Sequence, residues 1–221
     1  MGLCFFGPLI TAGKVSFIFG PGDSRAPLAR SLDHLTDSHL FPVSIGELKG
    51  KREIHSLAGG EVIRFGSPGK RPSIDRDPSS SGHDSQELSV TTFKSHAHPR
   101  FGVMLYRVSY RAKSLVYATD VEQKEGGYPG IIEFARGADL LIHDAQYLRR
   151  EYISLTKSKK GWGHSTVEMA AEVARKAGVK RLVLFHHEPT HDDTAMRRIE
   201  RKARGLFPAS LTARQGMELW V

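Results

Sequence analysis

Residues 163–187 read Gly163-His-Ser-Thr-Val-Glu-Met-Ala-Ala-Glu-Val-Ala-Arg-Lys-Ala-Gly-Val-Lys-Arg-Leu-Val-Leu-Phe-His-His187. The string Ser165-Thr-Val-Glu168 is a capping box that opens a helix, and Gly178 stands where a glycine commonly closes one. The apolar run Leu182–Phe185 that follows has the length and β-rich composition of a strand. A helix that leads directly into an apolar strand is typical of layered α/β folds.

Strands and helices alternate in the same way on both sides of this stretch. We expect strands at Leu115–Ala118 and Leu140–Ile142, with a helix over Pro129–Arg136 between them. A second capping box at Thr190–Asp193 predicts a helix that runs toward Arg204. Further short strands are expected at Val15–Phe19, Glu61–Phe65, Ser89–Phe93, Val103–Tyr110, Ala209–Thr212 and Met217–Val221. The pattern predicts the α/β class.

Length and composition fit one globular domain over residues 1–221. Of the 221 residues, 39% are hydrophobic and 25% are charged, so a core can form without a disulfide or metal staple. Residues 67–87 are almost all polar, glycine or proline, and we expect a flexible insertion there. The single cysteine, Cys4, cannot form an intrachain disulfide, which favours a reducing, cytoplasmic location. An apolar run of about 18 residues does not occur, so no membrane partner is expected.

Net charge is the least ordinary feature of the composition. The chain has 32 Lys and Arg against 24 Asp and Glu, a formal net charge of +8. Such an excess favours anionic partners such as RNA, although many basic domains gain only solubility from it. Cations gather between Arg149 and Lys160, with Trp162 close by, and we predict Lys159 and Lys160 as substrate contacts. A solvated loop would have the same composition.

Polar residues close three of the expected strands. Asp120, His143 and His186 each follow an apolar run. Ligands of layered α/β folds bind at the carboxyl ends of strands, so these side chains can converge although they are far apart in sequence. His98, which precedes a strand, can approach the same cleft. Imidazole and carboxylate ligands suit zinc, manganese or iron, whereas a single histidine is more often an ordinary core or surface residue.

His164 lies just before the helix that the first capping box opens. Free backbone N–H groups and the positive end of the helix dipole meet there, and both attract phosphate. We therefore predict His164 as an acid or phosphate contact, with Ser165 at the same helix entry. An exposed histidine that merely precedes a helix is the alternative.

Four strings, in this order, resemble the later motifs of the metallo-β-lactamase fold hydrolases, particularly the branch near ribonuclease Z and related phosphodiesterases. They are Tyr117-Ala-Thr-Asp120, Leu141-Ile-His-Asp-Ala145, Gly163-His-Ser-Thr166 and Leu184-Phe-His-His-Glu-Pro189. Phe41-Pro-Val-Ser44 and the turn at Gly59–Ile63 also read like this branch, so the resemblance covers nearly the whole chain. Each string alone is a weak signal, but four with matching order and spacing are a strong one.

The resemblance implies an αββα four-layer sandwich with a dinuclear metal site, usually of zinc. It implies that His98 binds the first metal ion, that Asp120 bridges both ions, and that His186 binds the second. His96 is an alternative to His98, because the local spacing is loose.

The implied reaction is hydrolysis of a phosphodiester, in RNA or in a small molecule, by a metal-activated water. The resemblance implies that His164 contacts the scissile phosphate or the leaving group. It implies that His143 and Asp144 support His164 from behind. Thioester or lactam hydrolysis is not excluded by the fold.

One motif of the family, His-x-His-x-Asp-His, does not occur anywhere in the sequence. Met1–Ile10 resembles the residues that follow it, so we expect the chain to begin downstream of that motif and to lack the first strands of the sandwich. Two protein ligands would then remain for each ion where catalytic zinc usually has three, which predicts weak metal binding and little hydrolysis. An uncovered sheet edge would favour pairing with a second copy as a homodimer. The alternative function is a non-catalytic nucleic-acid or anion-binding module that retains the fold.

Overall fold

The computed structural model describes residues 11, 13, 15–22, 27–36, 44–67, 69–77 and 86–221. The chain divides into two compact units, Met1–Gly59 and Gly60–Val221, and each is described by itself. The string Met1–Ile10 with Cys4, most of Phe41–Ser44, and residues 68 and 78–85 of the expected insertion lie outside the described residues. Within the described ranges, no helix is long and apolar enough to cross a membrane.

The first unit is a βαβ arrangement. Strand β1 (Val15–Pro21) pairs in parallel with β2 (Lys51–Leu57) over their whole lengths. Helix α2 (Leu28–Leu35) contacts both strands, because the side chain of Leu28 lies over Gly20 and its backbone N–H donates to Ser56 Oγ at 2.9 Å. A short 3-10 helix, η2 (Ile45–Glu47), precedes β2, and a capping box between Ser44 and Glu47 caps its N-terminus. Only β1 of these elements was expected from the sequence.

The second unit is built on a mixed eight-stranded sheet of order β10-β9-β8-β7-β6-β5-β3-β4. Its strands are β3 (Val62–Phe65), β4 (Ser73–Asp75), β5 (Leu88–Ser95), β6 (Val103–Tyr110), β7 (Lys113–Ala118), β8 (Leu140–Asp144), β9 (Arg181–Phe185) and β10 (Ser210–Thr212). In the sheet, neighbouring strands pair antiparallel from β4 through β3, β5 and β6 to β7. From β7 through β8 and β9 to β10 they pair in parallel. Strand β4 lies inside the expected insertion.

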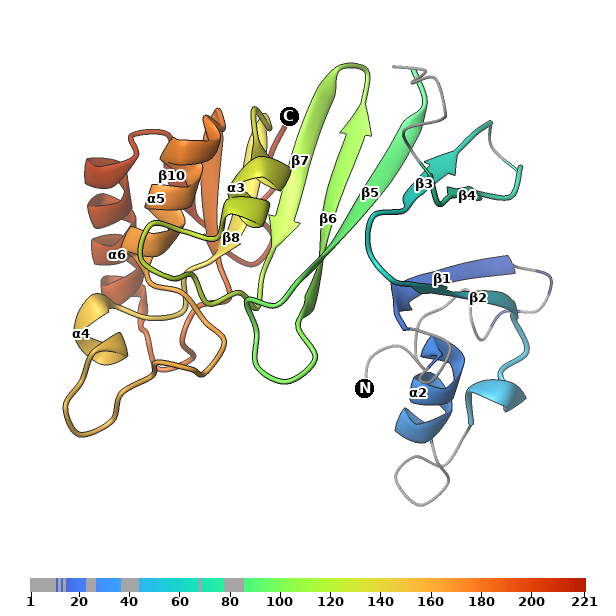
Figure 1. The fold of residues 1–221 in the computed structure, drawn as a ribbon, viewed down its shortest axis with the longest axis horizontal. Helices are drawn as coiled ribbons and strands as arrows, with labels where there is room; N and C mark the ends of the chain where they lie inside the picture. The colour runs from blue at the N-terminus through green and yellow to red at the C-terminus, as the bar shows by residue number, and fades with distance from the viewer. Residues whose placement is uncertain are drawn as a thin grey trace. The chain divides into compact units, whose positions relative to one another are not determined.

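Four helices accompany the parallel half of the sheet (Figure 1). They are α3 (Pro129–Ala135), α4 (Arg149–Tyr152), α5 (Val167–Ala177) and α6 (Asp193–Leu206). Helix α5 packs against β8 and β9 and against its neighbours α3 and α6. Its apolar face, with Val167, Ala170 and Ala174, is fully buried in the same core cluster as the strand residues Leu141 and Leu182. The carboxyl ends of β7, β8 and β9 are therefore held by one continuous core.

The caps of α5 and α6 differ from the expected ones by one residue or more. Thr166, not Ser165, is the N-cap of α5, and Gly178 closes the helix in the left-handed conformation at φ 64°. The N-cap of α6 is Asp192, whose Oδ1 accepts from Ala195 N at 2.7 Å, so the helix begins later than the Thr190 box predicts. The strand expected at Met217–Val221 is wrong, because these residues are not in strand conformation and pair with no strand of the described part of the chain. The other predicted strands and helices, and the α/β class, are confirmed.

Candidate metal centre

Five polar side chains meet where three parallel strands end. Asp120 follows β7, Asp144 is the last residue of β8, and His186 follows β9. His98 lies in the turn after β5, and His164 comes immediately before the entry to α5. Because β7, β8 and β9 are adjacent and parallel, their carboxyl ends fall on one edge of the sheet, as the sequence predicts.

Backbone strain marks two of these positions. Asp120 has φ 56° and His186 has φ 58°, so both adopt the left-handed conformation that side-chain-bearing residues rarely take. Each such residue costs on the order of 1 kcal/mol and persists only where its surroundings fix it. The left-handed conformation turns the backbone sharply at the end of each of the two strands, β7 and β9. His186 Nε2 then lies 3.3 Å from Asp120 Oδ1.

Asp144 organises the centre of the cluster. Its side chain is fully buried, and Oδ1 accepts hydrogen bonds from Ser165 N at 3.0 Å and Gln146 N at 3.1 Å. Its Oδ2 lies 2.7 Å from Nδ1 of His164, and 4.0 Å from Nδ1 of His186. Three backbone or side-chain donors thus fix one carboxylate that has no access to solvent.

The ring of His164 is held between the other histidines. It stacks on His186 at a centroid distance of 4.7 Å and meets His98 edge-on at 5.9 Å. Burial works to lower the pKa of His164, but the hydrogen bond to Asp144 and the surrounding carboxylates outweigh it and raise that pKa. Because Nδ1 faces Asp144, the second ring nitrogen, Nε2, is left for a substrate or ion.

The donor set fits a divalent cation. One group of possible ligand atoms comes from His98, Asp120 and His164, and a second from Asp144, His164 and His186, with all atoms of a group within 4.8 Å of one another. Nδ1 of His186 is buried and has no hydrogen-bond partner among the described residues, which is the state of an imidazole nitrogen that an ion would satisfy. Mixed imidazole and carboxylate ligands are those of zinc, manganese and iron sites.

His98, not His96, belongs to the cluster, and a glycine makes this approach possible. A Cβ built on Gly163, which has φ +94°, would collide with the imidazole of His98 and lie 2.8 Å from Cδ of Pro99. His96 is exposed and lines the adjoining hollow instead. The Gly-His-Ser-Thr string therefore needs its glycine, Gly163, so that His98 and Pro99 can approach the backbone closely. The family resemblance of the string alone did not indicate this contact.

His143 lies behind the cluster and is completely buried. Gln123 Nε2 lies 3.0 Å from His143 Nε2, while Gln123 Oε1 accepts from Tyr128 N, so the amide donates to the ring. Nδ1 of His143 consequently carries the proton and donates to the backbone carbonyl of Asp144 at 2.7 Å. Burial lowers the pKa of His143. This neutral ring braces the end of β8 from inside the core.

Ser165 also connects distant segments. Its hydroxyl donates to the carbonyl of Val121 and accepts from Gln123 N at 3.1 Å, which ties the residues after β7 to the entry of α5. With exposure of 0%, Ser165 presents no surface to a substrate.

The two lysines predicted as substrate contacts differ in their surroundings. Lys159 is half-buried, and its Nζ lies 3.8 Å from the ring centroid of Trp162, whereas Lys160 is exposed.

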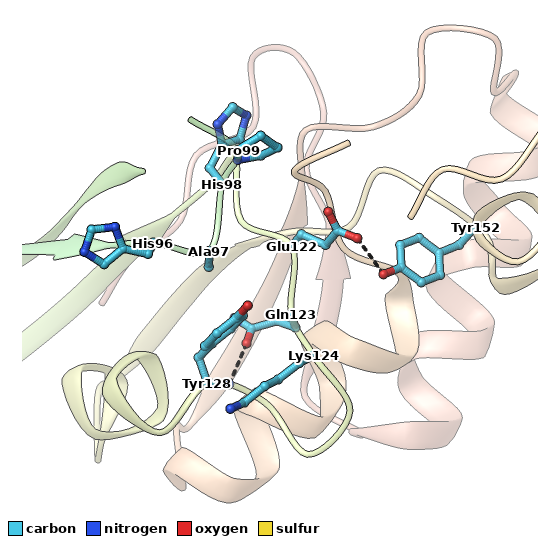
Figure 2. A pocket seen from close by; sticks show the side chains of 9 residues that line it. All are labelled: His96, Ala97, His98, Pro99, Glu122, Gln123, Lys124, Tyr128 and Tyr152. Atoms are coloured by element: carbon cyan, nitrogen blue, oxygen red, sulfur yellow. Dashed lines mark hydrogen bonds between the residues drawn. The ribbon is translucent and has the colours of Figure 1, made fainter. Parts of the chain in front are cut away.

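A feature that the sequence did not indicate is the carboxylate of Glu122. Its Oε1 accepts from Tyr152 Oη at 2.6 Å and Gly161 N at 2.7 Å, and its Oε2 accepts from Gly163 N at 2.8 Å. Glu122 and Tyr152 line a hollow of about 240 Å³ that reaches His98 (Figure 2). The whole turn between α4 and His164 is thus anchored to the segment that follows Asp120.

Comparison with known proteins assigns the family. A family model described as "Beta-lactamase superfamily domain" matches residues 25–187, and the chain belongs to this superfamily. Ribonuclease Z of Brevibacillus brevis is 35% identical over 105 residues, which are 46% of this chain and 30% of that protein. Ribonuclease Z of Gemmatimonas aurantiaca is 43% identical over 91 residues, 41% of this chain and 27% of the relative. The resemblance to the branch near ribonuclease Z is confirmed, although the matched part spans less than a third of these relatives.

Solved structures agree on the fold. The metallo-β-lactamase fold protein YhfI from Bacillus subtilis superposes with a TM-score of 0.59 at 16% identity, covering 93% of this chain and 65% of YhfI. The short form of human tRNase Z gives a TM-score of 0.55 at 18% identity, with 91% and 66% covered. Zn(2+)-bound PqqB from Methylobacterium extorquens gives 0.58 at 17% identity, with 95% and 66% covered. At these identities the likeness establishes the metallo-β-lactamase fold alone.

Proposed function

We propose that the chain is a metal-dependent hydrolase that cleaves phosphodiesters. The observation that carries the proposal is the His164–Asp144 pair, with 2.7 Å between Nδ1 and Oδ2, set among the two groups of metal-binding donors. The ribonuclease Z names of the relatives support the substrate class. Zinc is the proposed metal, with manganese or iron as alternatives of the same ligand chemistry.

Each residue of the cluster has a proposed task. His98, Asp120 and His186 would hold the metal, which supplies charge stabilisation of the phosphoryl oxygens and an acidified water. Asp144 keeps His164 oriented through Nδ1 and favours its protonated form, so that Nε2 can donate a proton or hydrogen bond to the phosphate or the leaving oxygen.

The remaining predicted residues act around this centre. His143 positions Asp144 through its backbone carbonyl and transfers no proton, because both ring nitrogens are engaged inside the core. Ser165 serves the site through its bonds to Val121 and Gln123. Lys159 and Lys160 are proposed to attract the anionic substrate at the rim. A single domain over 1–221, the flexibility of residues 67–87, a homodimer and a cytoplasmic location stay predictions.

Asp120→Ala tests the proposal, with bis(4-nitrophenyl) phosphate as substrate and elemental analysis for bound zinc. Since the His-x-His-x-Asp-His string does not occur in the sequence, we expect slow turnover and substoichiometric metal in the unmodified chain, both abolished by the substitution and by a chelator. Asp193→Asn, an exposed acidic change outside the cluster, should leave both unchanged. Turnover that survives both Asp120→Ala and chelation would refute the assignment.

The second candidate, a non-catalytic module that binds nucleic acid or another anion, is favoured by the basic surface around α4. It predicts binding without turnover and without dependence on metal. Undetectable hydrolysis at saturating zinc, together with salt-sensitive RNA binding, would favour this candidate over the hydrolase.

A further inference from the structure

A hollow of about 490 Å³ lies between helices α4 and α6, apart from the metal-binding cluster. The two helices lie close together at one end of the second unit, as Figure 1 shows. Its lining consists of four cationic and two apolar side chains, which are Arg149, Arg150, Arg198, Lys202, Leu148 and Ile153. A wall of four positive charges around one concave surface is costly unless anions compensate it.

The charges of this α4–α6 hollow are mostly uncompensated within the described part of the chain. Lys202 pairs with Glu168 at 2.5 Å, but Arg149, Arg150 and Arg198 have no carboxylate partner among the described residues. Glu151, which lies on α4 itself, is already used: one oxygen accepts from Leu148 N at 2.8 Å, and the other lies 3.0 Å from His191 Nε2. Three exposed guanidinium groups are thus left for a ligand from outside.

The hollow is tied to the metal-binding cluster through the chain. Tyr147 contacts the ring of His164 edge-on at 6.1 Å, and Arg149 follows only two residues later, at most about 8 Å along the backbone. The ammonium of Lys159 lies over the rings of Tyr147 and Trp162. Trp162 is 56% exposed, so part of its indole is accessible to a ligand.

Cations that follow a path and an exposed aromatic ring are the two elements of single-stranded nucleic-acid binding. Leu148 and the 46%-exposed Ile153 add an apolar floor that suits the faces of bases and ribose. We propose that the α4–α6 hollow binds the phosphate backbone of a single-stranded RNA, and that the strand passes Trp162 on its way to the metal-binding cluster.

This inference rests on the proposed function and deepens it, because it selects a polynucleotide over a small phosphodiester as the substrate. Planar guanidinium groups bind phosphate oxygens in a bidentate manner, which explains why arginine prevails over lysine in the lining.

Fluorescence anisotropy of a labelled oligouridylate of about 12 nucleotides, within the range that one groove covers, tests the proposal. It is measured in chelator at several salt concentrations, so that neither metal nor turnover enters. For Arg149→Ala/Arg198→Ala we expect about tenfold weaker binding and a salt slope shallower by about 1.4, since each lost phosphate contact removes about 0.7. Arg149→Lys/Arg198→Lys should keep the slope, because it retains both charges.

The matched control is Lys94→Ala/Arg175→Ala, which removes two exposed cations that do not line the hollow. Equal loss in both double variants would mean diffuse attraction by net charge and would overturn the proposal. Absence of oligouridylate binding would overturn it too, as would binding of phosphatidylserine vesicles in its place. Failure here combined with chelator-sensitive hydrolysis of bis(4-nitrophenyl) phosphate leaves the proposed function standing, and success here without hydrolysis leaves the binding site standing.

Discussion

Replacing Glu122 by glutamine should release the turn that leads from α4 to His164. The carboxylate accepts three hydrogen bonds, from Tyr152 Oη, Gly161 N and Gly163 N, at 2.6 to 2.8 Å. A carboxamide places an NH₂ group where one oxygen was. Tyr152 can turn its hydroxyl to accept from that group, but a backbone N–H cannot, so whichever way the amide points, one glycine N–H loses its acceptor.

The size of the effect follows from the charge. A hydrogen bond to a charged group is worth about 1.5–3 kcal/mol. In Glu122→Gln one such bond is lost and a glycine N–H faces the new NH₂ group instead, so we expect the closed turn to lose about 2 kcal/mol of stability. Opening of the turn would then be about 30-fold more populated, since 1.4 kcal/mol corresponds to a factor of ten.

Limited proteolysis reads this opening directly, because Lys157, Lys159 and Lys160 all lie in the turn and provide trypsin sites. When opening is fast compared with cleavage, the cleavage rate follows the open population, so Glu122→Gln should be cut about 30-fold faster at these lysines. Glu125→Gln is the matched control, an exposed glutamate three residues away. Equal cleavage of Glu122→Gln and the unmodified chain would refute the anchoring role of Glu122.

Two further predictions concern a glycine and a buried carboxylate. Gly163→Ala should weaken zinc binding by about tenfold or more, because the added Cβ would displace the His98 ring. The control is Gly161→Ala, which is also at positive φ but has no atom within 4 Å of the added Cβ, and it should leave zinc binding unchanged. A competition titration against a chromophoric chelator measures both variants, and equal loss of zinc affinity in the two would contradict the role of the close approach between Gly163 and His98. Asp139→Asn should destabilise the chain by about 2 kcal/mol, because the carboxylate accepts from Lys180 Nζ and Ser114 N at 2.8 Å each. The hydrogen bond from Lys180 lowers the pKa of Asp139, although burial opposes this, so its contribution is complete above the unfolded value near 3.8 and is lost as pH falls through the lower folded pKa. Urea unfolding from pH 7 to pH 2 should therefore show a smaller acid loss in Asp139→Asn than in the unmodified chain, and parallel curves would contradict the assignment.

Local signals explain which elements were predictable. Helix α5 has its N-terminal cap, its buried alanine face and Gly178 within a dozen residues, so its position follows from neighbours in sequence. Strand β2, Lys51-Arg-Glu-Ile-His-Ser-Leu57, has few apolar residues, and it is a strand because β1 pairs with it more than thirty residues earlier. Helix α4 is only four residues long and has no periodicity to detect.

The site divides in the same way. The convergence of Asp120, His186 and His98 was predictable because strand ends and family-like strings locate these residues in sequence, whereas their metal-binding role stays a prediction. Glu122 was not, because its partners are 30 to 41 residues away and their backbone N–H groups leave no trace in residue type. Ser165 has the identity of a helix cap, yet its hydroxyl bonds to Val121, 44 residues away, and Thr166 takes over the cap. Tertiary contacts decide between two chemically similar neighbours, and a sequence pattern alone does not contain them.

The polar side chains of the site are already held in place by the fold before any ligand binds. Asp144 is immobilised by two backbone N–H groups and by His164, and the turn that carries Gly163 is fixed by Glu122. The strained backbones of Asp120 and His186 persist because the core under β7 and β9 holds them. Folding has therefore already met the entropic cost of orienting these groups, and a ligand that reaches the edge of the sheet encounters oriented donors rather than a mobile set. The release of the turn in Glu122→Gln would restore part of that cost, so loosening the turn should impair the site although Glu122 is absent from both groups of possible metal ligands among the described residues.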